Sequence, residues 1–122
     1  MDLQTAWKEK SEELRLAGVP ESKLDAWYLL EYVTGVSKAG YLTDPGKTLT
    51  ETQEKQFLEL TEKRKQRIPL QHLTGVQEFM GYEFRVGPDV LIPRQDTEIL
   101  VETAADRLQD NLQILDLCTG SG

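Results

Sequence analysis

A short apolar run that leads into a Gly-x-Gly turn constrains the fold of this chain more than any other feature. Residues 112–115 (Leu-Gln-Ile-Leu) are typical of a buried parallel strand, and residues 116–122 follow as Asp-Leu-Cys-Thr-Gly-Ser-Gly. Because glycine has no Cβ and tolerates positive φ, such a turn lets the backbone approach a ligand. The sequence therefore predicts the first strand of an α/β domain at 112–115 and a cofactor loop after it. The helix expected to follow lies beyond residue 122, so we expect this chain to be the front part of a larger enzyme.

Three interpretations of this loop remain open from the residues alone. A nicotinamide or flavin site needs a third glycine further along to pack the helix beneath a pyrophosphate. A methyltransferase site places an acidic residue at the strand end and the glycine turn against the methionine part of S-adenosylmethionine, and Asp116 occupies that acidic position. An ordinary strand-to-helix turn would use Asp116 only to accept from local N–H groups.

Composition limits the classes of function. The net charge is −7, from 14 Lys+Arg against 21 Asp+Glu, which disfavours direct binding of DNA or RNA. No apolar stretch approaches the roughly 20 residues that span a bilayer, and the N-terminus has no secretory signal. Cys118 is the only cysteine, so we expect no disulfide and a cytoplasmic location. His72 is the only histidine, and it predicts a packing role and no metal site.

Helical spacing dominates the chain before Pro69. Gly18 and Gly35 follow two apolar stripes as helix ends, a short helical turn covers residues 38–42, and residues 50–53 (Thr-Glu-Thr-Gln) have the spacing of a capping box. The basic cluster at 63–67 is expected to be a solvated helix end. The residues expected to face inward are Leu3, Ala6, Trp7, Leu14, Ala17, Leu24, Trp27, Tyr28, Leu30, Val33, Phe57, Leu60 and Ile68.

The pattern changes after Pro69. Residues 76–79 and 82–86 predict a β-hairpin around Met80-Gly81, and a further helix is expected to start close to Asp96 and Thr97. The segment at its start supports two interpretations. In one, Asp96 or Thr97 caps the helix and Glu98 favours its dipole. In the other, Arg94, Thr97 and Glu98 line a pocket beside the cofactor.

Four stretches in this order resemble the release factor glutamine methyltransferase family, also called protein-(glutamine-N5) methyltransferases. They are residues 69–75 (Pro-Leu-Gln-His-Leu-Thr-Gly), 78–84 (Glu-Phe-Met-Gly-Tyr-Glu-Phe), 91–98 (Leu-Ile-Pro-Arg-Gln-Asp-Thr-Glu) and 114–122 (Ile-Leu-Asp-Leu-Cys-Thr-Gly-Ser-Gly). The resemblance covers the whole chain in element order, and the first 60 or so residues match mainly as a helical domain.

The resemblance implies a mainly α-helical N-terminal bundle at 1–68 that helps hold a protein substrate. It also implies a β-hairpin linker at 69–92 and, at 93–122, the first helix and strand of a Rossmann-like, seven-stranded methyltransferase domain. The implied reaction moves a methyl group from S-adenosylmethionine to the side-chain amide of the glutamine in the Gly-Gly-Gln loop of peptide chain release factors. The implied cofactor-binding residues are Asp116, Cys118, Thr119, Gly120, Ser121 and Gly122.

Two departures from the family pattern are Cys118, where Gly is commoner, and Gln95, where Pro is common. The second loosens the start of the helix at Thr97, where the possible pocket residues Arg94 and Thr97 lie. The family's catalytic Asn-Pro-Pro-Tyr motif does not occur in residues 1–122, so no catalytic residue is expected in this chain, and we expect it to be inactive alone. Two further functions compete with this one: a stand-alone helical protein-binding module, and the front part of a nicotinamide-dependent oxidoreductase.

Overall fold

The computed structural model describes residues 1–122 and divides into two compact units, Met1–Thr74 and Gly75–Gly122. The fold is mainly helical, with one small two-stranded antiparallel sheet. The expected linker, residues 69–92, is shared between the two units, because residues 69–74 belong to the first. None of the helices combines the length and the apolar character that crossing a membrane requires.

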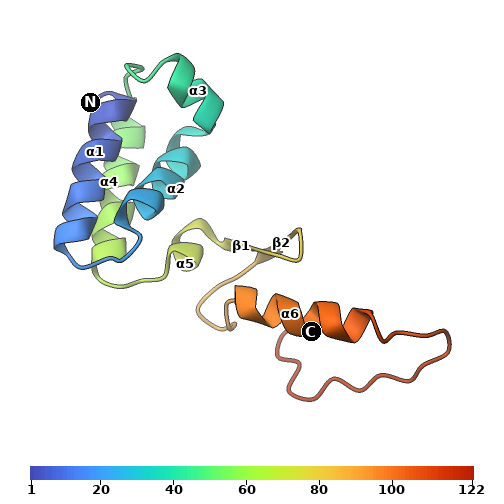
Figure 1. The fold of residues 1–122 in the computed structure, drawn as a ribbon. Helices are drawn as coiled ribbons and strands as arrows, with labels where there is room; N and C mark the ends of the chain where they lie inside the picture. Colours follow the sequence, from blue (N-terminus) through green and yellow to red (C-terminus); the bar gives the residue numbers. More distant parts are fainter. The chain divides into compact units, whose positions relative to one another are not determined.

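The first unit is built on three helices that pack against one another, α1, α2 and α4, with α3 and α5 as short additions (Figure 1). Their ends follow the local signals in the sequence. Thr50 and Gln53 form the expected capping box, and Gly18 and Gly35 take positive φ values of 83° and 70° just after α1 and α2. The bounds are α1 Leu3–Leu16, α2 Ser22–Thr34, α3 Lys38–Thr43, α4 Glu51–Lys65 and α5 Leu70–Thr74.

The core of this unit lies where α1, α2 and α4 meet. Most of the expected inward residues are buried or half-buried, with Phe57 only 1% exposed. The phase assigned to α2 was wrong in part, because Leu24 and Tyr28 are 46% and 45% exposed while Leu29 is fully buried. Since α2 is apolar on most of its faces, its spacing alone could not identify the face that meets α1 and α4. The buried apolar residues are Leu3, Ala6, Leu14, Val19, Ala26, Trp27, Leu29, Leu30, Tyr41, Leu49, Phe57 and Leu60.

The basic cluster at 63–67 is not simply a solvated helix end, which corrects the prediction. The Arg64 guanidinium donates to the Asp25 carboxylate at 2.9 Å, and their side chains are only 17% and 11% exposed. Arg67, with φ of 70°, donates to the carbonyl oxygens of Ala17 and Gly18 at 3.0 and 3.1 Å. A cation at the last carbonyls of a helix complements its dipole, so Arg67 closes α1 from a position far away in the sequence.

The second unit contains the predicted hairpin, β1 Val76–Phe79 and β2 Tyr82–Arg85, followed by α6 Gln95–Ala105. The strands pair antiparallel, with Phe79 opposite Tyr82, and Met80 and Gly81 form the turn at positive φ. The expected strand at 112–115 is absent, which corrects that prediction. A strand needs a hydrogen-bonded neighbour, and residues 112–115 pair with neither edge of β1–β2, the only sheet of the structure.

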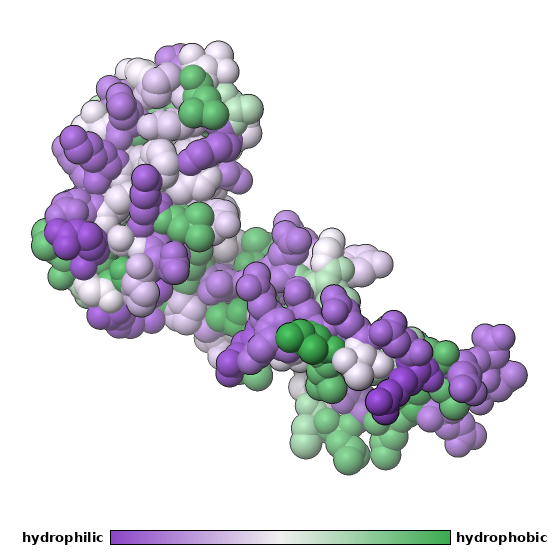
Figure 2. Space-filling view, in the orientation of Figure 1, coloured by the Kyte–Doolittle hydropathy of each residue, from purple (hydrophilic) through white to green (hydrophobic).

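Exposed apolar side chains lie among polar ones on α6 and the segment after it (Figure 2). Ile99 and Leu100 on α6 are each 67% exposed, and Leu115 is 82% exposed. The Rossmann-like arrangement that the resemblance implies is therefore not formed by residues 93–122, and it stays a proposal.

Candidate functional site

The implied cofactor loop, residues 116–122, is an open turn in the structure. Cys118, Gly120 and Gly122 take positive φ values of 60°, 67° and 87°, and Gly122 N donates to Thr119 O at 3.3 Å. Every residue of the loop is exposed, and Asp116 forms no hydrogen bond with a local N–H group. The glycines adopt positive φ, which the motif permits, and the assignment of residues 116–122 as a cofactor loop stays a prediction.

The polar residues at the start of α6 are arranged differently from the capping prediction. The helix begins at Gln95, one residue early, and Arg94 is its N-cap residue without a side-chain capping bond. The Asp96 carboxylate instead accepts from the Arg94 guanidinium at 2.8 Å, in an exposed pair. The prediction that Asp96 or Thr97 caps this helix was therefore wrong: Arg94 engages the Asp96 carboxylate, and Thr97 N donates to the Arg94 carbonyl oxygen.

Glu98 has a role that the sequence did not reveal. Its Oε1 accepts from the backbone N–H of Met80 at 3.0 Å, so α6 is tied to the tip of the hairpin. Met80 has a positive φ of 52°, and the contact holds that turn residue in place. No hydrogen bond or ion pair joins Arg94, Thr97 or Glu98 to residues 116–122. A pocket role for Arg94, Thr97 and Glu98 stays a prediction.

His72 lies on the five-residue helix α5 and is half-buried, as a packing role predicts. It differs from that prediction in one respect, because its Nε2 is buried and has no hydrogen-bond partner. No hydrogen bond or ion pair connects the His72 side chain to an acidic or nucleophilic residue. This geometry gives it no catalytic partner.

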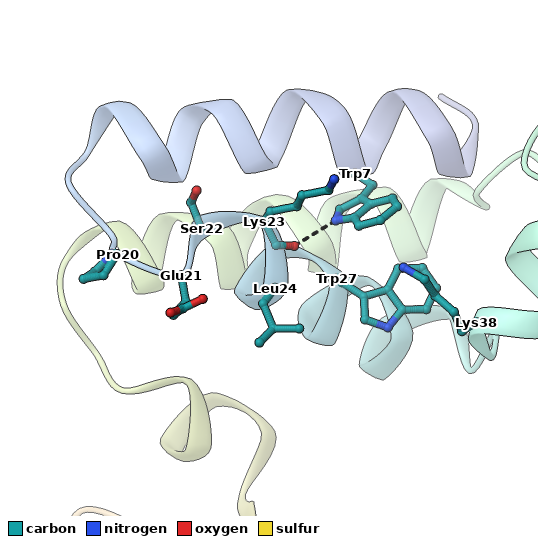
Figure 3. A pocket seen from close by; sticks show the side chains of 8 residues that line it. All are labelled: Trp7, Pro20, Glu21, Ser22, Lys23, Leu24, Trp27 and Lys38. Carbon is teal, nitrogen blue, oxygen red and sulfur yellow. Dashed lines mark hydrogen bonds between the residues drawn. The ribbon is translucent and has the colours of Figure 1, made fainter.

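A groove on the first unit gathers both tryptophans of the chain (Figure 3). Trp7 on α1, Trp27 on α2 and Tyr41 on α3 meet edge to face, with ring centroids 5.3–5.5 Å apart. The Lys38 Nζ lies 4.1 Å from the Trp7 ring centroid and 4.4 Å from that of Trp27. We call this the Trp7 groove; its volume is about 450 Å³, and its main lining residues are Trp7, Ser22, Lys23, Leu24, Trp27 and Lys38.

The groove continues into a second hollow of about 520 Å³ that shares Trp7, Ser22 and Lys23 with it. Lys8, Glu12 and Arg15 line this extension. The Arg15 guanidinium hydrogen-bonds to Glu12 and holds the pKa of that carboxyl below its ordinary value. Glu12 is therefore ionised, and Arg15 balances its negative charge.

The sequence did not predict this groove: Trp27 is a core residue as predicted, 6% exposed, whereas Trp7 is half-buried and lines the groove. One signal was present: Lys23 and Trp27 are four residues apart, which places them on the same face of a helix. Lys38 and Tyr41 come from α3, and only the tertiary structure brings them beside Trp7.

Comparison with known proteins connects the chain to one family. Residues 5–75 match the family described as the PrmC N-terminal domain. A release factor glutamine methyltransferase of Salmonella typhimurium is 44% identical over 124 aligned positions, covering 100% of this chain and 44% of that protein. Those of Moorella thermoacetica and Clostridium botulinum are 38% and 37% identical, covering 100% and 89% of this chain.

The chain spans less than half the length of these curated relatives, 39–44%. In two of these relatives the match covers the whole chain, and therefore the helical unit, the hairpin, α6 and the glycine loop. The residues quoted above for the resemblance lie within this matched length. On this evidence the chain belongs to the PrmC N-terminal domain family, and its relatives are release factor glutamine methyltransferases.

Proposed function

We propose that this chain is the N-terminal part of a release factor glutamine methyltransferase. Such an enzyme moves a methyl group from S-adenosylmethionine to the side-chain amide nitrogen of the glutamine in the Gly-Gly-Gln loop of a peptide chain release factor. The observation that carries the proposal is the 44% identity over the full chain, which includes the second unit. A stand-alone helical binding module would account for residues 5–75 alone.

The residues of the loop suit S-adenosylmethionine in chemical type. The Asp116 carboxylate would accept hydrogen bonds from the cofactor's amino group, and Gly120 and Gly122 allow the backbone to approach its methionine part. A Cβ placed on either glycine would meet no atom within 4 Å, so residues 1–122 supply an open portion of a site and not an enclosed one. When bound, the cofactor supplies an electrophilic methyl group on its sulfonium.

The amide nitrogen of glutamine is a poor nucleophile because its lone pair is delocalised into the carbonyl. A catalyst must therefore position this nitrogen and stabilise the charges that develop, which depends on preorganised polar groups. Residues 1–122 contain no Asn-Pro-Pro-Tyr tetrapeptide to hold the amide. We accordingly assign this chain a positioning role and no methyl transfer of its own.

In this proposal the helical unit, Met1–Thr74, holds the release factor. A pocket for one glutamine side chain offers little contact area, whereas a stable protein complex buries roughly 1,200–2,000 Å² in total. Additional recognition surface is therefore needed, and a separately packed helical unit can provide it. We expect weak binding by the chain alone, in the range of tens of micromolar or looser.

Methyl transfer tests the proposal directly. The product of the complete reading frame is incubated with radiolabelled S-adenosylmethionine and a release factor, with a release factor whose Gly-Gly-Gln glutamine is replaced by alanine as the control. We expect label only in the unaltered release factor. Equal labelling of both proteins would contradict the assignment of the acceptor, and hydride transfer from a nicotinamide cofactor would support an oxidoreductase instead.

Calorimetric titration of residues 1–122 with S-adenosylmethionine tests the assignment of the loop. We expect undetectable or very weak binding, since the loop is open and fully exposed. A micromolar dissociation constant would contradict this account of the cofactor site.

A further inference from the structure

We propose that the Trp7 groove is the docking site for an acidic segment of the protein partner, anchored by an apolar side chain. The inference rests on the proposed function for the partner's identity, since that partner would be the release factor. The location of the docking surface is inferred separately, from the charged side chains and aromatic rings of the Trp7 groove.

The groove is a locally cationic site on an acidic chain. Lys23 and Lys38 line it and neither forms an ion pair, and the same is true of Lys8 in its extension. Among the carboxylates of the two hollows, Glu12 is held by Arg15, which leaves Glu21 as the only unpaired acid. In the Trp7 groove itself two unpaired cations thus stand against one unpaired anion, on a protein whose net charge is −7. Lys8 adds a third cation in the extension and also borders a hollow that Glu9 and Glu13 line. This balance favours a partner segment that carries carboxylates.

The floor of the groove is formed mainly by the two indole rings, and the one hydrogen-bond donor of Trp7 is satisfied. The Trp7 Nε1 donates to the Lys23 carbonyl oxygen at 2.9 Å, so the indole presents ring surface and no unused donor. Leu24, 46% exposed, extends the apolar surface at the rim. Tryptophans in partly enclosed sites are the side chains most often found at energetic centres of protein interfaces.

Lys38 contributes both a positive charge and contact with the aromatic rings. Its ammonium lies over the faces of Trp7 and Trp27 at 4.1 and 4.4 Å, which holds the charge in place without neutralising it. A carboxylate that approaches Lys38 therefore meets a positioned cation, and its aliphatic neighbours meet the indole rings. A segment with alternating acidic and apolar side chains fits this surface, whereas a basic segment would be repelled.

Intrinsic fluorescence can follow this site directly, because the chain has only two tryptophans and both line the groove. Residues 1–122 are titrated with a release factor, and separately with a blocked peptide of glutamate and leucine and its lysine-for-glutamate counterpart. The test variant is Lys23→Gln with Lys38→Gln. The matched control is Lys47→Gln with Lys55→Gln, which removes the same charge at two exposed lysines that form no ion pair and line neither hollow.

We expect the release factor and the acidic peptide to change tryptophan emission saturably, and the basic peptide to leave it unchanged. The test variant should bind about 5- to 20-fold more weakly, as expected for the loss of two solvent-accessible ion pairs, while the control stays within about twofold. Circular dichroism verifies that all variants are folded. Midpoints are compared instead of amplitudes, because removing Lys38 changes the surroundings of both indoles.

The outcomes separate the two proposals. If the release factor binds the test variant as tightly as the unaltered chain, the groove proposal is overturned and release-factor docking stands. If only the acidic peptide binds, with the expected dependence on the lysines, the groove stands and docking of the release factor by this chain is overturned. No binding of either overturns both. A dimer in sedimentation that the test variant abolishes would make a second copy the occupant and overturn the groove proposal.

Discussion

The ion pair between Asp25 on α2 and Arg64 on α4 allows a quantitative prediction about the stability of the first unit. Its two side chains lie 39 residues apart, meet at 2.9 Å and are 11% and 17% exposed. Arg64→Met keeps the aliphatic stem and removes the guanidinium, which leaves the Asp25 carboxylate in a mostly buried site without its cation. Asp25→Leu leaves Arg64 with one remaining acceptor, the Ile68 carbonyl oxygen at 3.2 Å.

Breaking a buried pair from one side typically costs about 3–5 kcal/mol, because the other charge stays buried and unpaired. Both side chains keep some contact with water, so we expect Arg64→Met to cost about 3 kcal/mol, at the lower end of that range. Asp25→Leu should cost less, since Arg64 retains its bond to Ile68 and can extend toward solvent. Replacing both residues by apolar ones removes both buried charges, and we expect the double variant to lie within about 1 kcal/mol of the unaltered chain.

Urea unfolding followed by circular dichroism measures the three variants as a double-mutant cycle. For a unit of this size, a cost of about 3 kcal/mol lowers the melting temperature by roughly 12–24 °C. Arg15→Met serves as the control, because it breaks the exposed pair with Glu12 and should change stability little. The pair is not a coupled buried ion pair if Arg64→Met has the same melting temperature as the unaltered chain. The same conclusion follows if the double variant loses as much unfolding free energy as the two single variants together.

Three further changes test the remaining structural assignments by the same unfolding measurements. Trp27→Ala removes a ring that is 6% exposed and should cost about 3–5 kcal/mol; a change of a degree or two in melting temperature would exclude Trp27 from the core. Thr50→Ala removes half of the capping box of α4 and should cost about 1 kcal/mol, whereas Thr50→Ser should cost little. The backbone N–H of Thr5 lowers the pKa of the Asp2 carboxyl below its ordinary 3.8, so this group stabilises the fold above that pH and ceases to do so as pH falls through the lowered pKa. Asp2→Asn keeps a capping oxygen and should therefore flatten the loss of stability on acidification below about pH 4; an unchanged acid profile would show that Asp2 contributes nothing to it.

The helix boundaries of the first unit were predictable because their causes are local. A capping box needs only Thr50 and Gln53, three residues apart, and the ends of α1 and α2 need only a glycine at positive φ. The hairpin was equally accessible, since Met80-Gly81 separates two runs with strand character. In each case the residues that determine the structure are neighbours in the sequence.

What could not be predicted depends on which elements meet in space. The Arg64–Asp25 pair and the bonds from Arg67 to the end of α1 join residues 39 to 50 positions apart. The basic cluster at 63–67 was predicted to be solvated because the partners of Arg64 and Arg67 are distant in the sequence. The Trp7 groove also needed the tertiary structure, since its rings come from three helices.

In the glycine loop, the local turn that the motif favours forms although the strand predicted before it does not. Gly120 and Gly122 adopt positive φ because a glycine turn is a local preference, and it forms here without a sheet. The strand expected before it is a non-local structure: residues 112–115 need a neighbouring strand edge, and they pair with neither outer edge of the β1–β2 hairpin. Leu112, Ile114 and Leu115 are accordingly 50%, 73% and 82% exposed, although they are the residues a parallel strand would bury. Burying such side chains provides about 25 cal/mol for each Å² of apolar surface removed from water, so a neighbouring strand edge would both satisfy the backbone and cover these residues. The same step would place Asp116 at the carboxyl end of a strand, which is the position that the proposed cofactor role requires.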